Sequence, residues 1–267
     1  MNKILFLFLA SLCFGCVSNI PEEIAYRANN GAQNIVSMPV YLPNGGESSN
    51  QMVTKDFKNQ IYMRDERGCG NKGSQVGNRY SSPVLAVVSK KNMKLQHGHF
   101  DCSTQNTIWI ANSENIILDD VSAWNGSDNA LEIRNSKFIL VKNSVFGKTR
   151  GNKCIETENS IVIFYNVVLH DCIKAFAGER TSRHYPELIL FLNSKVSLIP
   201  DHTNYTFVCD SRVPHRYGLI LVSKTIWSAK NVNCPISSDV PDGLIDAILK
   251  DDLETIRKLI MPIYEKL

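Results

Sequence analysis

The dipeptide Asn-Ser recurs along this chain, each time with a short apolar run after it. It occurs in four ten-residue stretches, ANSENIILDD, RNSKFILVKN, ENSIVIFYNV and LNSKVSLIPD. Ser89, Ser113, Ser136 and Ser160 are separated by 24, 23 and 24 residues, and Ser194 follows 34 residues later, as though a loop were inserted. A near-constant period of this size predicts a solenoid in which each repeat stacks on the one before it.

The apolar runs between these corners have the length of β-strands. PVLAVV, TIWIA, FILV and LILFL are rich in β-branched and aromatic residues and show no helical period. Each repeat has no room for a helix, which excludes leucine-rich and ankyrin arrays. The sequence therefore predicts an all-β fold, a right-handed parallel β-helix. A β-sandwich is the alternative, although its strands need not keep a single period.

Length and composition are those of one globular domain with a sizeable core. The chain has 267 residues, of which 43% are hydrophobic and 21% charged, and its formal net charge is +3. That charge is too close to neutral to indicate nucleic acid as a partner, and no basic tract stands out. We expect a monomer.

The N-terminal segment has the features of an export signal. Lys3 precedes an apolar run that is too short to span a bilayer comfortably, so residues 1–15 are interpreted as a signal peptide. Gly15 before Cys16 is similar to the cleavage site of a bacterial lipoprotein, which makes Cys16 the candidate lipid anchor; plain secretion is the alternative. Residues 16–51 are rich in Asn, Gly, Pro and Ser and are predicted to be a flexible tether to the β-helix, expected over 52–235.

Six cysteines remain after Cys16, in a compartment that permits disulfide bonds. They are Cys69, Cys102, Cys154, Cys172, Cys209 and Cys234. Their connectivity is open from sequence, and buried unpaired thiols are equally compatible with their place in apolar strands. No pair has zinc-ligand spacing.

Residues 236–267 carry a helical period. Leu244, Ile248, Ile256 and Ile260 are among the apolar residues that recur at helical spacing. We interpret this segment as an amphipathic helix that ends at Pro262 and caps the solenoid, because an uncovered end rung invites edge-to-edge association. A partner-binding or membrane-surface helix is the alternative.

Polar residues outside the Asn-Ser repeat also recur in register. Asp128 and Asn152 are 24 apart, Asn129 and Lys153 are 24 apart, and Asn152 and Lys174 are 22 apart. Residues one period apart should lie above one another, about 4.8 Å per rung. One face of three rungs should therefore carry these five residues together with Glu156. Oxygen ligands beside ammonium groups suit calcium and an acidic substrate, whereas a solvated polar face is the alternative.

At these residues the sequence resembles the pectate lyase family. NIILDDVSAWNGSDNALEI, GNKCIETENSIVIFYNVVLHDCIKAFAG and SRVPHRYG follow one another as the corresponding segments do in that family, over about residues 85 to 230. The resemblance implies a pectin lyase-like β-helix and calcium-dependent β-elimination of an acidic polysaccharide such as polygalacturonate.

Carried over position by position, the resemblance also implies residue roles. Asp128 or Asn129 matches the first calcium carboxylate, and Asn152 and Glu156 match the pair of the next rung. Lys174 matches a substrate-binding lysine, Arg212 the catalytic arginine and Arg216 a following arginine. The pattern of the smaller pectate lyases instead makes Lys153 and Lys174 the functional lysines and places Ala177 where an arginine belongs. Asn152, and Asn129 in one alignment, stand where carboxylates belong, which should weaken calcium binding.

The sequence thus predicts an envelope-anchored or secreted polysaccharide lyase that uses calcium. Arg212 or Lys153 would remove the proton from the sugar carbon beside the uronate carboxylate. Lys174 would bind a neighbouring carboxylate of the substrate. A non-catalytic β-helix that binds polysaccharide or acts as a surface adhesin is the second hypothesis, and an epimerase that uses the same proton abstraction is the third. The expected location is the bacterial cell envelope, as an outer-membrane lipoprotein, or the exterior, with the membrane contacted through the lipid anchor only.

Overall fold

The computed structural model of the chain describes the backbone course of residues 34–37, 51–52 and 57–63. It further describes residues 85–103, 106–126, 128–149, 153–179, 184, 186–198, 205–209, 218–227, 232 and 234–267. Cys16, Asn152, Arg212 and Arg216 lie outside the described residues, so the predictions made for them stay predictions.

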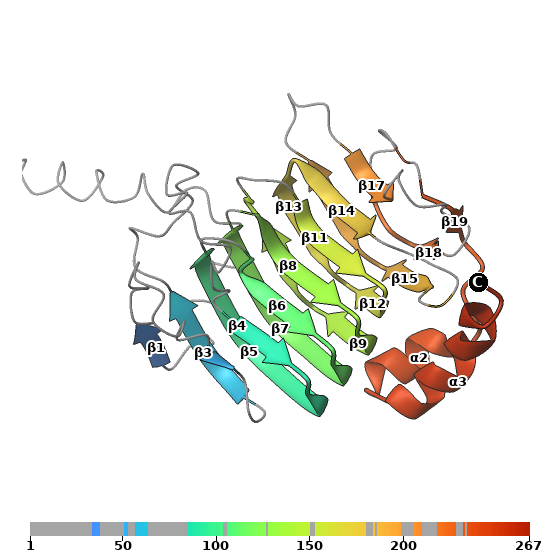
Figure 1. The fold of residues 1–267 in the computed structure, drawn as a ribbon, viewed down its shortest axis with the longest axis horizontal. Helices are drawn as coiled ribbons and strands as arrows, with labels where there is room; N and C mark the ends of the chain where they lie inside the picture. Colours follow the sequence, from blue (N-terminus) through green and yellow to red (C-terminus); the bar gives the residue numbers. More distant parts are fainter. Residues whose placement is uncertain are drawn as a thin grey trace, which may run out of the picture.

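The described strands form two parallel sheets that stack rung upon rung (Figure 1). The large sheet has the main order β1 (Asn34–Ser37), β3 (Phe57–Met63), β5 (Lys91–Ser103), β7 (Glu114–Gly126), β9 (Lys137–Lys142), β12 (Ile161–Tyr165), β15 (Glu187–Leu192), β18 (Gly218–Ser223) and β19 (Ile236–Ser237). The small sheet has the order β2 (Gln51–Met52), β4 (Leu85–Val88), β6 (Ile108–Ala111), β8 (Asn129–Arg134), β11 (Lys153–Glu158), β14 (Lys174–Glu179) and β17 (Tyr205–Cys209).

Three further strands branch from the large sheet and complete the turn of each rung. β10 (Val145–Gly147) pairs with β7 and β13 (Val168–Cys172), and β13 pairs with β16 (Lys195–Leu198). Neighbouring strands pair in parallel and in register, with Ile116 beside Ile139 and Ile155 beside Leu131. This arrangement confirms the predicted parallel β-helix. The strands begin earlier than expected, because β1 lies within the predicted tether and pairs with β3.

The Asn-Ser dipeptides form the corner between the small and the large sheet. Asn112, Asn135 and Asn159 adopt the left-handed conformation, with φ of 51°, 47° and 50°, which asparagine tolerates better than most residues. Each following serine closes the corner: Ser136 Oγ donates to the carbonyl of Arg134 at 2.7 Å and accepts from the backbone N–H of Ser113 at 3.1 Å. The serine hydroxyl therefore satisfies backbone groups of two successive rungs.

A second stack of the same corners lies at the other end of the large-sheet strands. Ser144 Oγ accepts from Val121 N–H, and Ser194 Oγ accepts from Val167 N–H, each at 3.1 Å. Asn143, Asn166 and Asn193 precede this corner, again with positive φ. Asn166 Nδ2 donates to Asn143 Oδ1 at 2.8 Å, which adds a side-chain ladder along the stack.

The two stacks correct the single series predicted from the serine spacing. Ser194 belongs to the second corner, so the 34-residue step consists of the seven residues from Ser160 to Val167, which pass from one corner to the other, and a rung of 27 residues from Val167 to Ser194. The predicted register is also wrong by one residue at Ser89. Its N–H donates to the carbonyl of Ala111, and Lys90 N–H donates to Ser113 Oγ, so Lys90 is the residue that aligns with Ser113.

The interior of the solenoid is a continuous apolar core. Leu95, Phe100, Leu131, Phe164 and Phe191 are among its fully buried members. The rings of Phe164 and Phe191 stack with their centroids 4.7 Å apart. A disulfide joins two core cysteines, Cys154 of β11 and Cys172 of β13, and Cys234 is disulfide-bonded as well.

A second apolar cluster lies on the outer face of the large sheet. Ile116 and Leu118 face the interior, whereas Ile117 between them faces outward, and β9, β12 and β15 repeat this alternation. Strands buried on both faces contain nearly continuous apolar runs, which explains FILV and LILFL.

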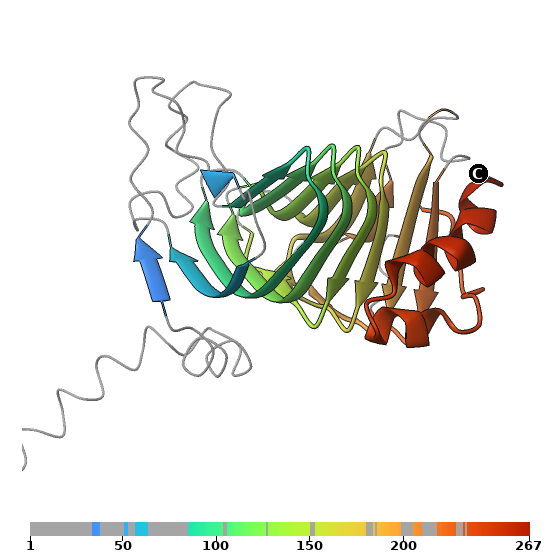
Figure 2. The same ribbon diagram turned by 90° about the horizontal axis from the view of Figure 1, so that it is seen from below.

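Two C-terminal helices cover this outer face, α2 (Leu244–Leu249) and α3 (Leu253–Tyr264) (Figures 1 and 2). They pack on the solenoid as expected, but over the flank of the sheet, because that flank is where the unmatched apolar side chains lie. The single predicted helix is divided in two at Asp251, which has a φ of 56°, and Asp252 caps α3 by accepting from Thr255 N–H. Pro262 does not end α3, since it lies in the last turn and the helix continues to Tyr264.

Charged groups fix the helices to the sheet. Asp251 lies between Lys94 of β5 and Lys142 of β9, with N–O distances of 2.7 and 2.5 Å. Arg257 lies 2.6 Å from Glu114 and over the ring of Phe138. Within the described part of the chain, no helix is long and apolar enough to cross a membrane.

Candidate functional site

The outer face of the small sheet differs from that of the large sheet in being polar. Leu131 and Ile133 point into the core, so Glu132 and Arg134 between and after them point outward. On the next rung, Glu156 aligns with Glu132 and Glu158 with Arg134. Neither helix packs on this face, because the residues of both helices belong to the outer cluster of the large sheet. Its titratable groups make it the candidate functional surface.

Asn129, Lys153 and Lys174 form a row along the start of the small-sheet strands. Backbone pairing places Lys153 beside Asn129 on one side and beside Lys174 on the other. This confirms the predicted stacking of Asn129 and Lys153. Lys174 aligns with Lys153 and not with Asn152, so the predicted register is wrong by one residue at that step.

The carboxylate of Glu156 contacts two members of the row, Lys153 and Asn129. Its Oε2 lies 2.7 Å from Lys153 Nζ and accepts from Asn129 Nδ2 at 2.9 Å. Its Oε1 faces a guanidinium nitrogen of Arg134 at 3.5 Å. Lys153 and Glu156 are both buried, and a buried charge requires a partner of this kind.

The contacts continue into a closed ring of five side chains. Asn129 Nδ2 also donates to Asn106 Oδ1 at 3.1 Å, and Asn106 donates to Glu132. Arg134 Nε pairs with Glu132 and, through its other nitrogen, returns to Glu156. We name this ring the glutamate ring; its members are Asn106, Asn129, Glu132, Arg134 and Glu156. The ring reaches solvent at Arg134, whose side chain is 36% exposed.

Within the ring, Glu132 has a perturbed ionisation. Burial raises the pKa of its carboxyl group to about 7, and the charges of Glu156 and Asp128 act in the same direction, while Arg134 and the hydrogen bond from Asn106 lower it. The desolvation of the carboxyl group is the largest of these effects. Glu132 therefore titrates near neutral pH.

The structure brings five of the predicted site residues together. Asp128, Asn129, Lys153, Glu156 and Lys174 lie together on the polar face, where Asp128 and Lys174 are half-buried. Ala177, which one alignment places at an arginine position, lies beside Glu156.

The described donors do not fit calcium. Calcium takes six to eight oxygen ligands, usually including several carboxylates. Glu156 is already occupied by Lys153, Asn129 and Arg134, and Asn129 directs its amide nitrogen at Glu156. Among the described residues, no three His, Cys, Asp or Glu side chains are grouped so as to hold a metal ion.

Sequence reasoning missed three members of the ring, Asn106, Glu132 and Arg134. A usable signal existed, because Glu132 and Glu156 are 24 residues apart, Glu132 lies between two core residues, and Glu156 follows the core residue Ile155. Charged residues inside an apolar alternation indicate a row that points outward from the sheet, whereas the prediction used only the polar residues before each strand.

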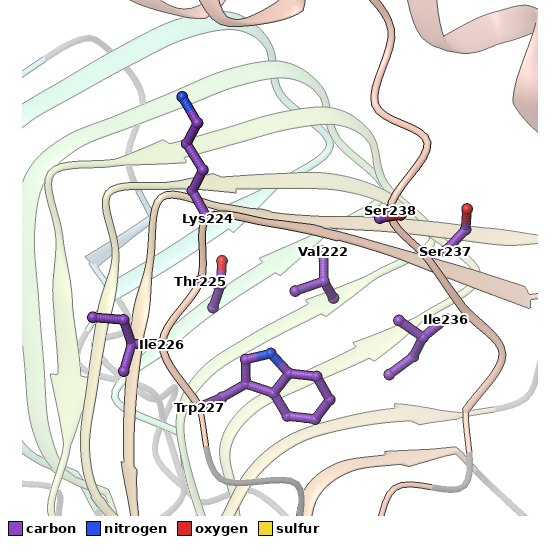
Figure 3. A pocket seen from close by; sticks show the side chains of 8 residues that line it. All are labelled: Val222, Lys224, Thr225, Ile226, Trp227, Ile236, Ser237 and Ser238. Carbon is purple, nitrogen blue, oxygen red and sulfur yellow. The ribbon is translucent and has the colours of Figure 1, made fainter.

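A separate cavity lies where β18 meets β19 at the C-terminal rung. Its volume is about 660 Å³, and Figure 3 shows the indole of Trp227 beside Val222 and Ile236. The remaining lining residues are Lys224, Thr225, Ile226, Ser237 and Ser238. Lys224 is the one titratable residue of this lining, so the cavity offers no acid–base pair, and it contains none of the predicted site residues.

The chain is similar to several solved β-helix structures, at low levels. It is 15% identical, with a TM-score of 0.36, to PfbA, a surface adhesin of Streptococcus pneumoniae, over 78% of this chain and 64% of that one. It is 13% identical, with a TM-score of 0.27, to a Bacillus subtilis pectate lyase mutant, over 80% and 64%. It is 11% identical, with a TM-score of 0.27, to a pectate lyase bound to a hexasaccharide, over 84% and 69%.

The chain thus spans about 64% of the length of the first solved structures it matches. No family model matches the chain, and no curated protein matches it significantly. Similarities at these identities and TM-scores carry no argument about activity, so the functional conclusion rests on the polar face itself.

Proposed function

We propose that the protein acts outside the cytoplasm on an acidic polysaccharide such as polygalacturonate and cleaves it by β-elimination. The observation that carries this proposal is the row of Asn129, Lys153 and Lys174 in register on a polar sheet face that the helices leave uncovered. Two lysines on adjacent rungs, beside an asparagine, give this face a positive charge at Lys174 that suits a polymer carrying carboxylates.

Lys174 is the residue assigned to the substrate carboxylate. Its side chain is half-buried, whereas that of Lys153 is buried against Glu156. A cation beside the uronate carboxylate acidifies the proton on the adjacent carbon. Removal of that proton to a base, with cleavage of the bond to the leaving oxygen, forms the carbon–carbon double bond, and the leaving oxygen takes up a proton.

The choice of base follows from the pairing of Lys153. An ammonium held 2.7 Å from a carboxylate is stabilised in its charged form, so Lys153 is a poor base. This favours Arg212 over Lys153 as the proton acceptor. Arg212 would need strong desolvation, since a guanidinium ordinarily stays protonated. Calcium has no step in this proposal, because the described donors do not fit it.

A second function, non-catalytic polysaccharide binding or surface adhesion, is favoured by one observation. The charges of the glutamate ring are paired, Arg134 with Glu132 inside the ring and Glu156 with the neighbouring Lys153, which is the arrangement of a structural network. In this case Lys174 would still bind the acidic polymer, but no bond would be cleaved.

The experiment that separates the two functions uses the purified mature chain. It is incubated with polygalacturonate and other polyuronates, and the ultraviolet absorbance of the unsaturated product is followed while binding is measured on the same polymers. Product formation supports the lyase. Binding without product supports the adhesin, release of an isomerised polymer without unsaturation would indicate an epimerase, and neither binding nor product contradicts the proposal.

Lys174→Ala is the site variant that tests this assignment. We expect loss of product formation, or of polymer binding if the protein is non-catalytic, because the substrate carboxylate loses its cation. Lys195→Ala, at an exposed lysine of β16, is the matched control and should behave as the wild type. An active Lys174→Ala variant would refute the assignment.

We also propose that the chain is anchored in the bacterial cell envelope through Cys16. The disulfide between Cys154 and Cys172 supports an oxidising compartment. In a bacterial host, Cys16→Ser should lose metabolic labelling by palmitate and leave the membrane fraction. If labelling persists in that variant, the anchor is elsewhere; if the wild type is exported but unlabelled, the chain is secreted without a lipid.

A further inference from the structure

The position that the resemblance assigns to calcium is occupied by a side chain of the protein. Lys153 Nζ lies 2.7 Å from Glu156 Oε2, the carboxylate expected to bind the metal. Asn129, the other expected ligand on the preceding rung, donates its amide to the same oxygen at 2.9 Å. Two donors thus converge on an oxygen that a metal ion would need.

The burial of Lys153 shows how firmly this position is held. Its side chain is 8% exposed, and that of Glu156 is 5% exposed. Breaking a buried ion pair by removing one partner is strongly unfavourable, because the remaining charge is left without compensation. A divalent cation entering here would have to displace the ammonium group and leave it unpaired, which opposes binding.

The neighbouring rung completes the arrangement. Lys174 pairs with Lys153 in the backbone register of adjacent strands, which lie about 4.8 Å apart, and like charges on neighbouring strands repel. Glu156 neutralises Lys153 and so reduces this repulsion. Lys174 is the half-buried member of the pair and borders solvent, where an anion can approach it.

We infer that the ammonium of Lys153 takes the place of a metal ion in this site, so that the face binds a carboxylate of an acidic saccharide through Lys174 without calcium. The metal-independence stands on the contacts of Lys153 and Glu156; the identity of the saccharide rests on the proposed function. A lysine that supplies the positive charge makes the site insensitive to the divalent cations of the surroundings.

Thermal unfolding in calcium chloride, magnesium chloride and EDTA tests the inference without any substrate. We expect the Tm of the wild type to be the same in all three. A cation that binds the native state at about one hundred times its Kd would raise the Tm by roughly 5–10 °C, so binding would be visible. A calcium-specific rise in the wild type that is lost in Glu156→Gln would overturn the inference.

Removing the ammonium provides the converse test. In Lys153→Ala the carboxylate of Glu156 becomes available, and we expect a calcium-dependent rise in Tm that is abolished in Lys153→Ala/Glu156→Gln. Lys195→Ala is the matched lysine control and should show no rise. A folded Lys153→Ala variant without a calcium response contradicts the inference; if that variant does not fold, the wild type and Glu156→Gln decide alone.

A second arm measures the reaction or binding on polygalacturonate in EDTA. Full retention supports metal-independence, whereas loss in EDTA with recovery in calcium overturns it. If the wild type neither binds nor cleaves any polyuronate, the proposed function fails, and the calcium titration of the protein alone still decides the inference.

Discussion

Glu132 carries a carboxyl group that the fold keeps largely out of water. Its side chain is 5% exposed, and its Arg134 and Asn106 partners do not fully offset the cost of burial. The pKa of the group is raised to about 7, so the folded protein binds a proton that the unfolded chain has released between about pH 4.5 and 7. Ionised Glu132 therefore reduces stability as the pH rises through this window.

Glu132→Gln should remove this dependence, because the amide has the same shape and no charge. We expect the stability of the variant relative to the wild type to increase by about 2 kcal/mol between pH 5 and pH 8. Urea unfolding of both proteins at the two pH values measures the difference. An equal offset at both pH values would show that Glu132 titrates normally.

At the residue scale, the sequence predicted which polar residues lie side by side better than it predicted how their side chains bond. The 24-residue period placed Asn129 and Lys153 side by side and brought Lys174 close. It could not show that Lys153 and Glu156 are bonded to each other, because the direction of a side chain is not encoded in the spacing. A glutamate such as Glu156 can either bind calcium or pair with a lysine ammonium group. Only the observed contact shows which of the two roles it has.

At the scale of elements, the Asn-Ser corners were predicted from the sequence, but their division into two separate stacks was not. Both stacks use Asn in the left-handed conformation, and serine hydroxyls close both, so one dipeptide encodes two corners. The period alone cannot assign a dipeptide to a stack. The spacing of Asn135 and Asn143 does allow this assignment, because only one six-residue strand separates the two corners.

The disulfide is the covalent link between elements of one rung. It closes a loop of 18 residues between β11 and β13, and both cysteines lie in the core. A crosslink of this length stabilises a fold by about 3 kcal/mol in the chain-entropy model.

Cys154→Ala/Cys172→Ala should therefore lower the Tm of the otherwise intact chain by roughly 6–12 °C. Circular dichroism during heating gives the measurement, with the near-native spectrum at low temperature as the check that the rungs still form. An unchanged Tm would mean that packing of the core alone determines the stability of this rung.

At the scale of the molecule, the helices and the large sheet depend on each other. Ile248 and Ile260 are fully buried against outward-facing residues such as Leu140, Ile163 and Leu190. Contiguous exposed apolar faces drive association, so we expect this flank to associate with other copies once the helices no longer cover it.

Ile248→Asp should release the helices, because a carboxylate in this apolar contact has no partner. We expect association or precipitation, with increased binding of a hydrophobic dye, measured by light scattering and fluorescence. Leu249→Asp is the matched control, since Leu249 is the next residue on the same helix and is 58% exposed. An Ile248→Asp variant that remains monomeric and does not bind the dye would contradict this account.

The architecture as a whole was predictable because its physical cause is repetition. A constant period and strand-length apolar runs admit few folds other than the parallel β-helix. The location of the helices was harder to predict. An amphipathic pattern indicates that a helix packs on an apolar surface, but it does not indicate which surface. The outward-facing leucines of LILFL indicate which surface it is, because they form an apolar outer face that needs to be covered.

The two corner stacks have a consequence for how such a chain can change in length. Each rung makes the same bonds to the rung before it and to the rung after it, through Ser113, Ser136 and Ser160 on one side and Ser144 on the other. A duplicated segment of 23 or 24 residues would find ready partners above and below, and the 27-residue step from Val167 to Ser194 shows that a longer rung can also keep its corner serine in line. The solenoid can therefore be lengthened by the addition of whole rungs.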